Sequence, residues 1–203
     1  MTMTTTLPAT KREITRADIL PRETYARERA ALRQAMVAVK RKRRVEVGPI
    51  ATFYFENYQT MWHQVHEMLF IEKGGDAQID DELSAYNPLV PNGSELVATV
   101  MFEIDDPVRR AATLLRLGGI ETHMFIRVDG ETIRGVPEGD VDRTRSDGKT
   151  SSVHFVHFPF TPAQIAKFKA GGTQAILGFD HPEYGHMAML PDATRVALAA
   201  DLD

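Results

Sequence analysis

Residues 95–136, ELVATVMFEIDDPVRRAATLLRLGGIETHMFIRVDGETIRGV, contain the clearest fold signal in the chain. The apolar and β-branched residues at their start are typical of a strand. Asp106 and Pro107 are the residue types preferred at the N-cap and first position of a helix, and Gly118-Gly119 is typical of a helix end. Asp129-Gly130 favours a tight turn between two further strands. The stretch therefore predicts a strand, a helix and a β-hairpin, in that order.

Residues 152–190 show the same order of elements. A strand comes first, then Thr161-Pro162 opens a helix and Gln164 completes a capping box. Gly171-Gly172 ends that helix, and two strands joined by a turn follow. We infer two βαββ pseudo-repeats, 95–136 and 152–190. The alternative is that two unrelated βαββ segments look alike at this level of detail.

The remaining segments predict helices around this core. Residues 1–13 are expected to form a flexible tail, and residues 14–203 a single domain. Helices are predicted from about Pro21 to Val39 and from Tyr58 to Lys73, with a last helix after Pro191. The predicted fold class is α+β, with a single mixed or antiparallel sheet built from the two βαββ units and flanked by N-terminal and C-terminal helices.

Composition excludes several kinds of protein. The chain has 203 residues, a net charge of −4 and no cysteine, which excludes disulfides, thiolate catalysis and an iron–sulfur cluster held by Cys of this chain. No apolar run reaches the roughly 18 residues of a membrane span, and no signal peptide is visible. We expect a cytoplasmic protein that binds neither nucleic acid nor membrane.

Histidines are concentrated in the second βαββ unit. Together with a neighbouring carboxylate they form a candidate set of metal ligands: His154, Asp180, His181 and His186. Imidazole and carboxylate ligands suit iron, zinc or manganese, so a divalent metal is the cofactor this set would hold. Two alternatives stay open, a turn held by structural hydrogen bonds and a metal-free acid–base site.

Two further residues are candidates for catalysis in the same pocket. Tyr184 is a candidate proton donor, and Glu67 a candidate base or ligand, a role that Glu56 could also fill. We expect His154, His181 and Glu67 to converge near the 180–186 turn.

Five consecutive bases follow the first predicted helix: Lys40, Arg41, Lys42, Arg43 and Arg44. Such a run can bind a phosphate-bearing ligand or an acidic partner. It can also be a solvated helix end, where cations interact favourably with the helix dipole. In either case we expect the run to contribute little to folding stability.

Several short segments carry a family resemblance: Phe55-Glu56-Asn57, His66-Glu67-Met68, Tyr86-Asn87-Pro88-Leu89, Ser152-Val153-His154-Phe155 and Asp180 to His186. With the basic run before Gly48-Pro49, they resemble the bacterial domain of unknown function 3501 family. This chain departs from the family pattern at His63 and His66, where polar residues such as Gln are more usual.

The resemblance implies a context more than an activity. Members tend to be encoded near rubrerythrin-like proteins and iron–sulfur oxidoreductases, which implies a redox or peroxide-stress role by association. One expectation is a His/carboxylate enzyme that binds a metal or a small molecule. The other is a non-catalytic accessory protein that docks to a rubrerythrin-like or iron–sulfur redox partner through its basic run.

Overall fold

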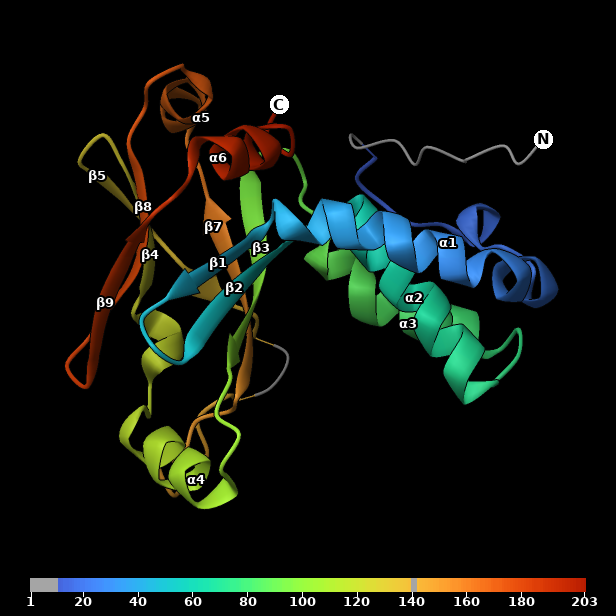
Figure 1. The fold of residues 1–203 in the computed structure, drawn as a ribbon, viewed down its shortest axis with the longest axis horizontal. Helices are drawn as coiled ribbons and strands as arrows, with labels where there is room; N and C mark the ends of the chain where they lie inside the picture. Colours follow the sequence, from blue (N-terminus) through green and yellow to red (C-terminus); the bar gives the residue numbers. More distant parts are fainter. Residues whose placement is uncertain (1–10, 140–141) are drawn as a thin grey trace.

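The computed structural model describes residues 11–139 and 142–203, and most of the predicted tail, 1–13, lies outside these ranges. The strands form two antiparallel sheets (Figure 1). The five-stranded sheet contains, in spatial order, β1 (Arg44–Val47), β2 (Ala51–Glu56), β3 (Glu95–Phe102), β7 (Val153–Pro159) and β6 (Val136–Pro137). The four-stranded sheet contains β5 (Glu131–Arg134), β4 (Met124–Val128), β8 (Ala175–His181) and β9 (Tyr184–Met189).

Both βαββ units are present, and the α+β class is confirmed. The first unit is β3, α4 (Pro107–Arg116), β4 and β5, and the second is β7, α5 (Pro162–Lys169), β8 and β9. Equivalent strands pair, β3 with β7 and β4 with β8. Each unit therefore gives its first strand to one sheet and its hairpin to the other, so the strands form two sheets rather than the single sheet expected.

Local signals explain where these elements begin and turn. Asp106 accepts a hydrogen bond from the Arg109 amide and Thr161 accepts one from the Gln164 amide, as the capping patterns predict. The β4–β5 turn needs a positive φ at both central residues, and Asp129 (φ 45°) and Gly130 (φ 86°) have it.

The main core lies between the two sheets. Alternation along β2 directs Phe53 and Phe55 inward, where Phe53 packs against Phe158 of β7 and Phe179 of β8. C-terminal helix α6 (Asp192–Ala199) lies beside α5 at one end of the sheets, and α4 lies at the other end (Figure 1).

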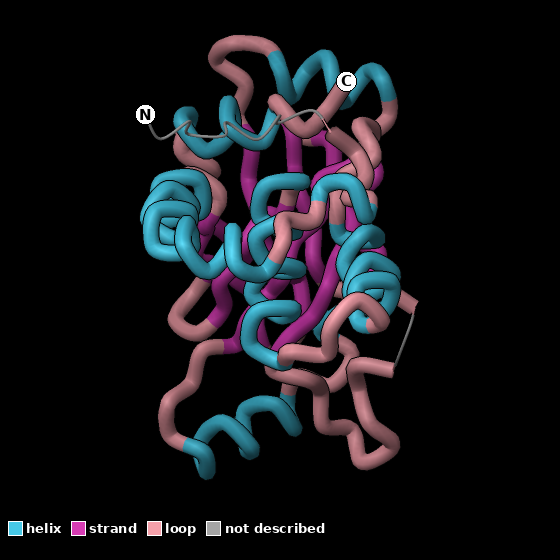
Figure 2. Tube along the Cα trace, turned by 90° about the vertical axis from the view of Figure 1, so that its right-hand side faces the viewer, coloured by secondary structure: helices cyan, strands magenta, loops and turns pink. Residues whose placement is uncertain are grey.

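A separate helical layer projects from the sheets. It consists of α1 (Arg22–Arg41), α2 (Tyr58–Glu72) and α3 (Gln78–Tyr86), which lie in front of the strands in Figure 2. Its own core includes Tyr25, Trp62 and Val65, and this core continues to Val97 on β3. None of the helices in the described ranges is both long and apolar enough to span a membrane.

Strand β1 was not predicted, because the basic run conceals its pattern. Helix α1 continues to Arg41, two residues beyond the prediction, and β1 begins at Arg44. Alternation then exposes Arg44 and Glu46 and buries Val45 and Val47. The run of bases thus spans a helix end and an edge strand, and its members face different surroundings.

Candidate anion-binding cleft

An open cleft of about 720 Å³ lies where α1 meets the edges of both sheets. One wall is a stripe on α1 at helical spacing, made of Arg33, Met36, Val37, Lys40 and Arg41. The facing wall comes from β1, β2, β9 and the turn after β9, and is made of Arg44, Val45, Glu46, Tyr54, Ala188, Met189 and Pro191. His63 on α2 completes the lining.

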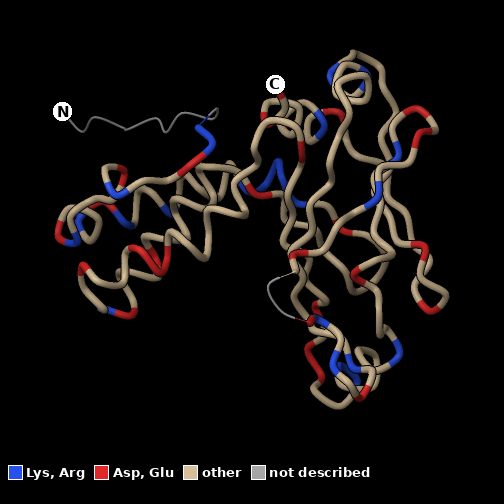
Figure 3. The backbone as a smooth tube through the Cα atoms, turned by 180° about the vertical axis from the view of Figure 1, so that it is seen from behind, with Lys and Arg blue, Asp and Glu red and all other residues tan. Residues whose placement is uncertain are grey.

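Four bases surround this cleft. In Figure 3, Lys and Arg follow the chain from the end of α1 into β1. Arg44 pairs with Glu46 at 2.9 Å, whereas no carboxylate pairs with Arg33, Lys40 or Arg41 among the residues that the structure describes. Uncompensated positive charge converging on one cleft creates a potential that attracts anions.

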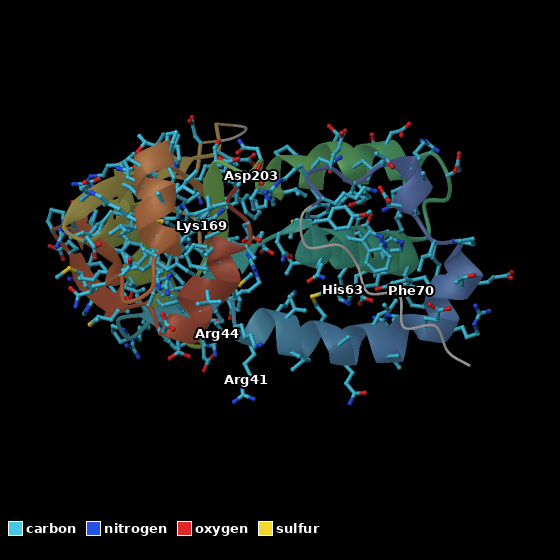
Figure 4. All side chains as sticks on the ribbon, turned by 90° about the horizontal axis from the view of Figure 1, so that it is seen from above. Arg41, Arg44, His63, Phe70, Lys169 and Asp203 are labelled. Atoms are coloured by element: carbon cyan, nitrogen blue, oxygen red, sulfur yellow. The ribbon has the colours of Figure 1, made fainter. Side chains whose placement is uncertain are left out.

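His63 is the unusual residue of the cleft. His63 lies between α1 and α2 (Figure 4) and is 8% exposed, and neither ring nitrogen has a hydrogen-bond partner among the residues that the structure describes. Burial lowers the pKa of His63 below its ordinary value; the charge of Glu67 opposes this shift, and the charges of Lys40 and Arg33 add to it. The imidazole is therefore neutral near pH 7 and has one donor and one acceptor to offer a ligand. Such unsatisfied buried groups are uncommon in folded proteins.

The five bases of the predicted binding run separate into two groups. Lys40, Arg41 and Arg44 line the cleft, whereas Lys42 and Arg43 do not. Arg43 is 5% exposed and forms a buried ion pair with Asp201. The expectation that the whole run contributes little to folding is therefore wrong for Arg43, because its guanidinium joins the backbone of β2 to Ala197 and Asp201 near the C-terminus.

Of the predicted metal ligands, the two buried histidines are used by local hydrogen bonds. His154 Nε2 donates to the Ser151 carbonyl at 2.9 Å, and its Nδ1 has no hydrogen-bond partner within residues 11–139 and 142–203. His181 Nε2 donates to the Gly118 carbonyl at 3.2 Å, and its Nδ1 accepts from the Glu183 amide. His154 therefore fixes the turn before β7, and His181 joins the β8–β9 turn to the segment after α4.

The other two predicted ligands face different partners. Asp180 pairs with Arg134 and with His123 at 3.1 Å, and His186 packs against the Tyr184 ring, 4.4 Å between centroids. In the ranges described, no three His, Asp or Glu side chains are grouped so that they could hold a metal ion. The structure does not assemble the set His154, Asp180, His181 and His186 into one site.

The predicted catalytic pair is also separated. The Tyr184 hydroxyl donates to the Val47 carbonyl at 2.7 Å and accepts from the Ile50 and Ala51 amides at 3.2 Å. Its proton is therefore committed to the β1–β2 hairpin.

Glu67 lies in the helical layer, away from the sheets that carry His154 and His181. It accepts from Arg29 at 2.7 Å and from the Tyr25 hydroxyl at 2.7 Å. Hydrogen bonds from Arg29 lower the pKa of Glu67 to about 2. It stays ionised and paired, so it is unsuited to act as a base near pH 7.

Sequence reasoning pointed to part of the cleft and missed the rest. The basic run indicated Lys40, Arg41 and Arg44, but Arg33 and His63 were not assigned to a site. Arg33 has the i, i+7 and i+8 spacing to Lys40 and Arg41 that places bases on one helix face, which is a usable signal. Nothing in the sequence indicates that His63 meets that face.

Comparisons with known proteins agree with this fold. Residues 13–202 match the family described as Protein of unknown function (DUF3501). A crystal structure of a novel protein of unknown function from Burkholderia pseudomallei is similar, with a TM-score of 0.87 and 40% sequence identity, covering 94% of this chain and 99% of that one. No curated protein matches the chain. Because the family match spans nearly the whole sequence, the chain belongs to the DUF3501 family.

Proposed function

We propose that this protein binds a small organic anion in the cleft between α1 and edge strands β1 and β9. The observation that carries the proposal is His63, a buried imidazole with both nitrogens unpartnered, which lines a cleft with four bases. A phosphate or carboxylate group at this place would accept hydrogen bonds from the bases and from the imidazole N–H. The proposal keeps the expectation that the protein binds a small molecule, but it places the binding site in this cleft and not at the β8–β9 turn.

The walls favour an organic ligand over a bare ion. Met36, Val37, Val45 and Met189 contribute apolar surface to the cleft. Binding sites for small molecules typically combine such surface with a few polar groups that fix orientation. The ligand class is therefore an organic phosphate or carboxylate with a short hydrocarbon part.

Calorimetric titration with butyl phosphate and succinate tests this function. Arg41→Gln removes one exposed base of the cleft and should weaken binding about tenfold, the usual effect of one charge-assisted hydrogen bond. Lys169→Gln is the matched control, because Lys169 is an exposed base at the end of α5, outside the cleft (Figure 4). Lack of binding by either anion would refute the proposal.

Two substitutions of His63 separate hydrogen bonding from shape. His63→Gln keeps a donor and an acceptor, so it should retain most of the affinity for butyl phosphate. His63→Leu fills similar space without polar atoms and should weaken binding. Equal affinities for both variants would show that the imidazole does not contact the anion.

The accessory-protein function is a second candidate, because two large apolar residues lie exposed beside the bases. Val37 is 67% and Met189 61% exposed, and both line the cleft. An acidic redox protein with an apolar centre would fit such a surface. Titration with a purified rubrerythrin-like protein tests it: binding should weaken at high salt and with Val37→Asp, and no binding at low salt would exclude this candidate.

A further inference from the structure

A second cavity adjoins the cleft and shares Lys40 and Tyr54 with its walls. It has a volume of about 280 Å³ and lies between the outer face of the five-stranded sheet and helices α2 and α3. We call it the Glu56 chamber, after the carboxylate in its lining. A molecule bound in the cleft thus lies next to a second binding volume.

Glu56 is a buried acid without a base. The alternation that directs Phe55 into the core places Glu56 on the outer face of β2, where it is 8% exposed. Its Oε1 accepts from the Thr99 hydroxyl at 2.7 Å. Within the described ranges no Lys, Arg or His forms an ion pair with it.

Lys40 and Arg43 both line the chamber, and Arg43 is used elsewhere. Its Nη2 donates to the Glu56 backbone carbonyl at 3.1 Å, and its charge pairs with Asp201. A buried carboxylate that lacks a cation is costly unless a partner is supplied. A cationic group on the ligand would supply that partner.

The opposite wall offers acceptors for the same cation. The Gln64 amide N–H points to the Tyr86 hydroxyl at 3.4 Å, and no donor in the described part of the chain bonds to the amide carbonyl of Gln64, so this carbonyl can accept from a ligand. An ammonium group has three N–H donors and no acceptor, so a carboxylate together with an amide carbonyl matches it. A second anionic group in the chamber would instead be repelled by the Glu56 carboxylate.

We propose that the Glu56 chamber binds the protonated amine of a zwitterionic ligand whose phosphate or carboxylate lies among the bases of the cleft. This inference rests on the proposed function and narrows its ligand class to amino acids and amine-bearing phosphates. Lys40, at the boundary between the two volumes, faces the anionic end of the ligand.

Three probes with a common anionic group test the inference by calorimetry: butyl phosphate, hydroxybutyl phosphate and aminobutyl phosphate. The wild-type protein should bind the amine about tenfold more tightly than the other two, because only the amine forms an ion pair with Glu56. Glu56→Gln keeps an acceptor for Thr99 and should bring the affinity ratio of amine to butyl phosphate close to one. Arg41→Gln should weaken all three probes alike, and Lys169→Gln should change none.

The possible outcomes separate the two proposals. If wild-type protein binds butyl phosphate and aminobutyl phosphate equally, the Glu56 chamber has no role and the anion cleft stands. An amine preference that survives in folded Glu56→Gln protein would also overturn the inference. If none of the probes binds, the proposed function fails and the inference fails with it. The three-probe comparison in wild-type protein decides the matter even if Glu56→Gln does not fold.

Discussion

Replacing Arg43 tests the claim that one base in an apparently solvated run is essential to the fold. Arg43→Gln removes the ion pair to Asp201 together with hydrogen bonds to the carbonyls of Phe55, Glu56 and Ala197, at 2.9, 3.1 and 3.2 Å. Asp201 is 1% exposed, and burial already raises the pKa of its carboxyl. Breaking such a buried pair from one side costs about 3–5 kcal/mol. For a chain of this length the melting temperature should fall by roughly 10 °C.

Thermal and urea unfolding measure this loss, with Arg41→Gln as the matched control. Arg41 is exposed on the last turn of α1, so its substitution should change stability by less than about 0.5 kcal/mol. The double variant Arg43→Gln/Asp201→Asn should lose less than the sum of the single variants, because the second change removes the unpaired charge. If Arg43→Gln and Arg41→Gln melt together, the buried role of Arg43 is wrong.

Three further predictions follow from groups with defined partners. Tyr184→Phe should lower the free energy of unfolding by about 1–3 kcal/mol, because the Val47 carbonyl and two hairpin amides lose their partner; an unchanged urea midpoint would contradict this. The pKa of Glu67 is about 2 in the folded protein, against about 4.3 in the unfolded chain. Ionised Glu67 therefore stabilises the fold at pH values above about 4.3, and this contribution is lost as the pH falls towards 2. The free energy of unfolding should consequently fall less steeply with acidification in Glu67→Gln than in the wild-type protein. Burial keeps the pKa of His63 below its ordinary value, and a bound anion favours the charged imidazole, so affinity for the non-titrating probe butyl sulfate should rise on acidification, as His63 gains its proton. His63→Gln should abolish this rise.

Local residue patterns determined the order and the ends of most elements. Capping at Asp106 and Thr161 and the turn at Asp129-Gly130 involve residues a few positions apart, so the sequence alone was sufficient to predict them. For the same reason, both βαββ units were recognisable. Strand β1 was missed because consecutive bases hid its short alternation.

The division of strands between two sheets depended on tertiary structure. Strand periodicity shows which residues share a face, but it does not show which strands pair. The pairing of β3 with β7 and of β4 with β8 joins segments far apart in the chain.

The candidate site shows most clearly that the sequence alone does not determine which side chains meet in space. The sequence identified the bases at 40–44, but the burial of Arg43 depends on Asp201, which is 158 positions away. It identified His154 and His181 as candidate ligands, but Nε2 of each donates to a backbone carbonyl, of Ser151 and Gly118 respectively. His63 became a site residue only because α2 places it against the basic face of α1, since the chemistry of a side chain is set by the groups around it in space.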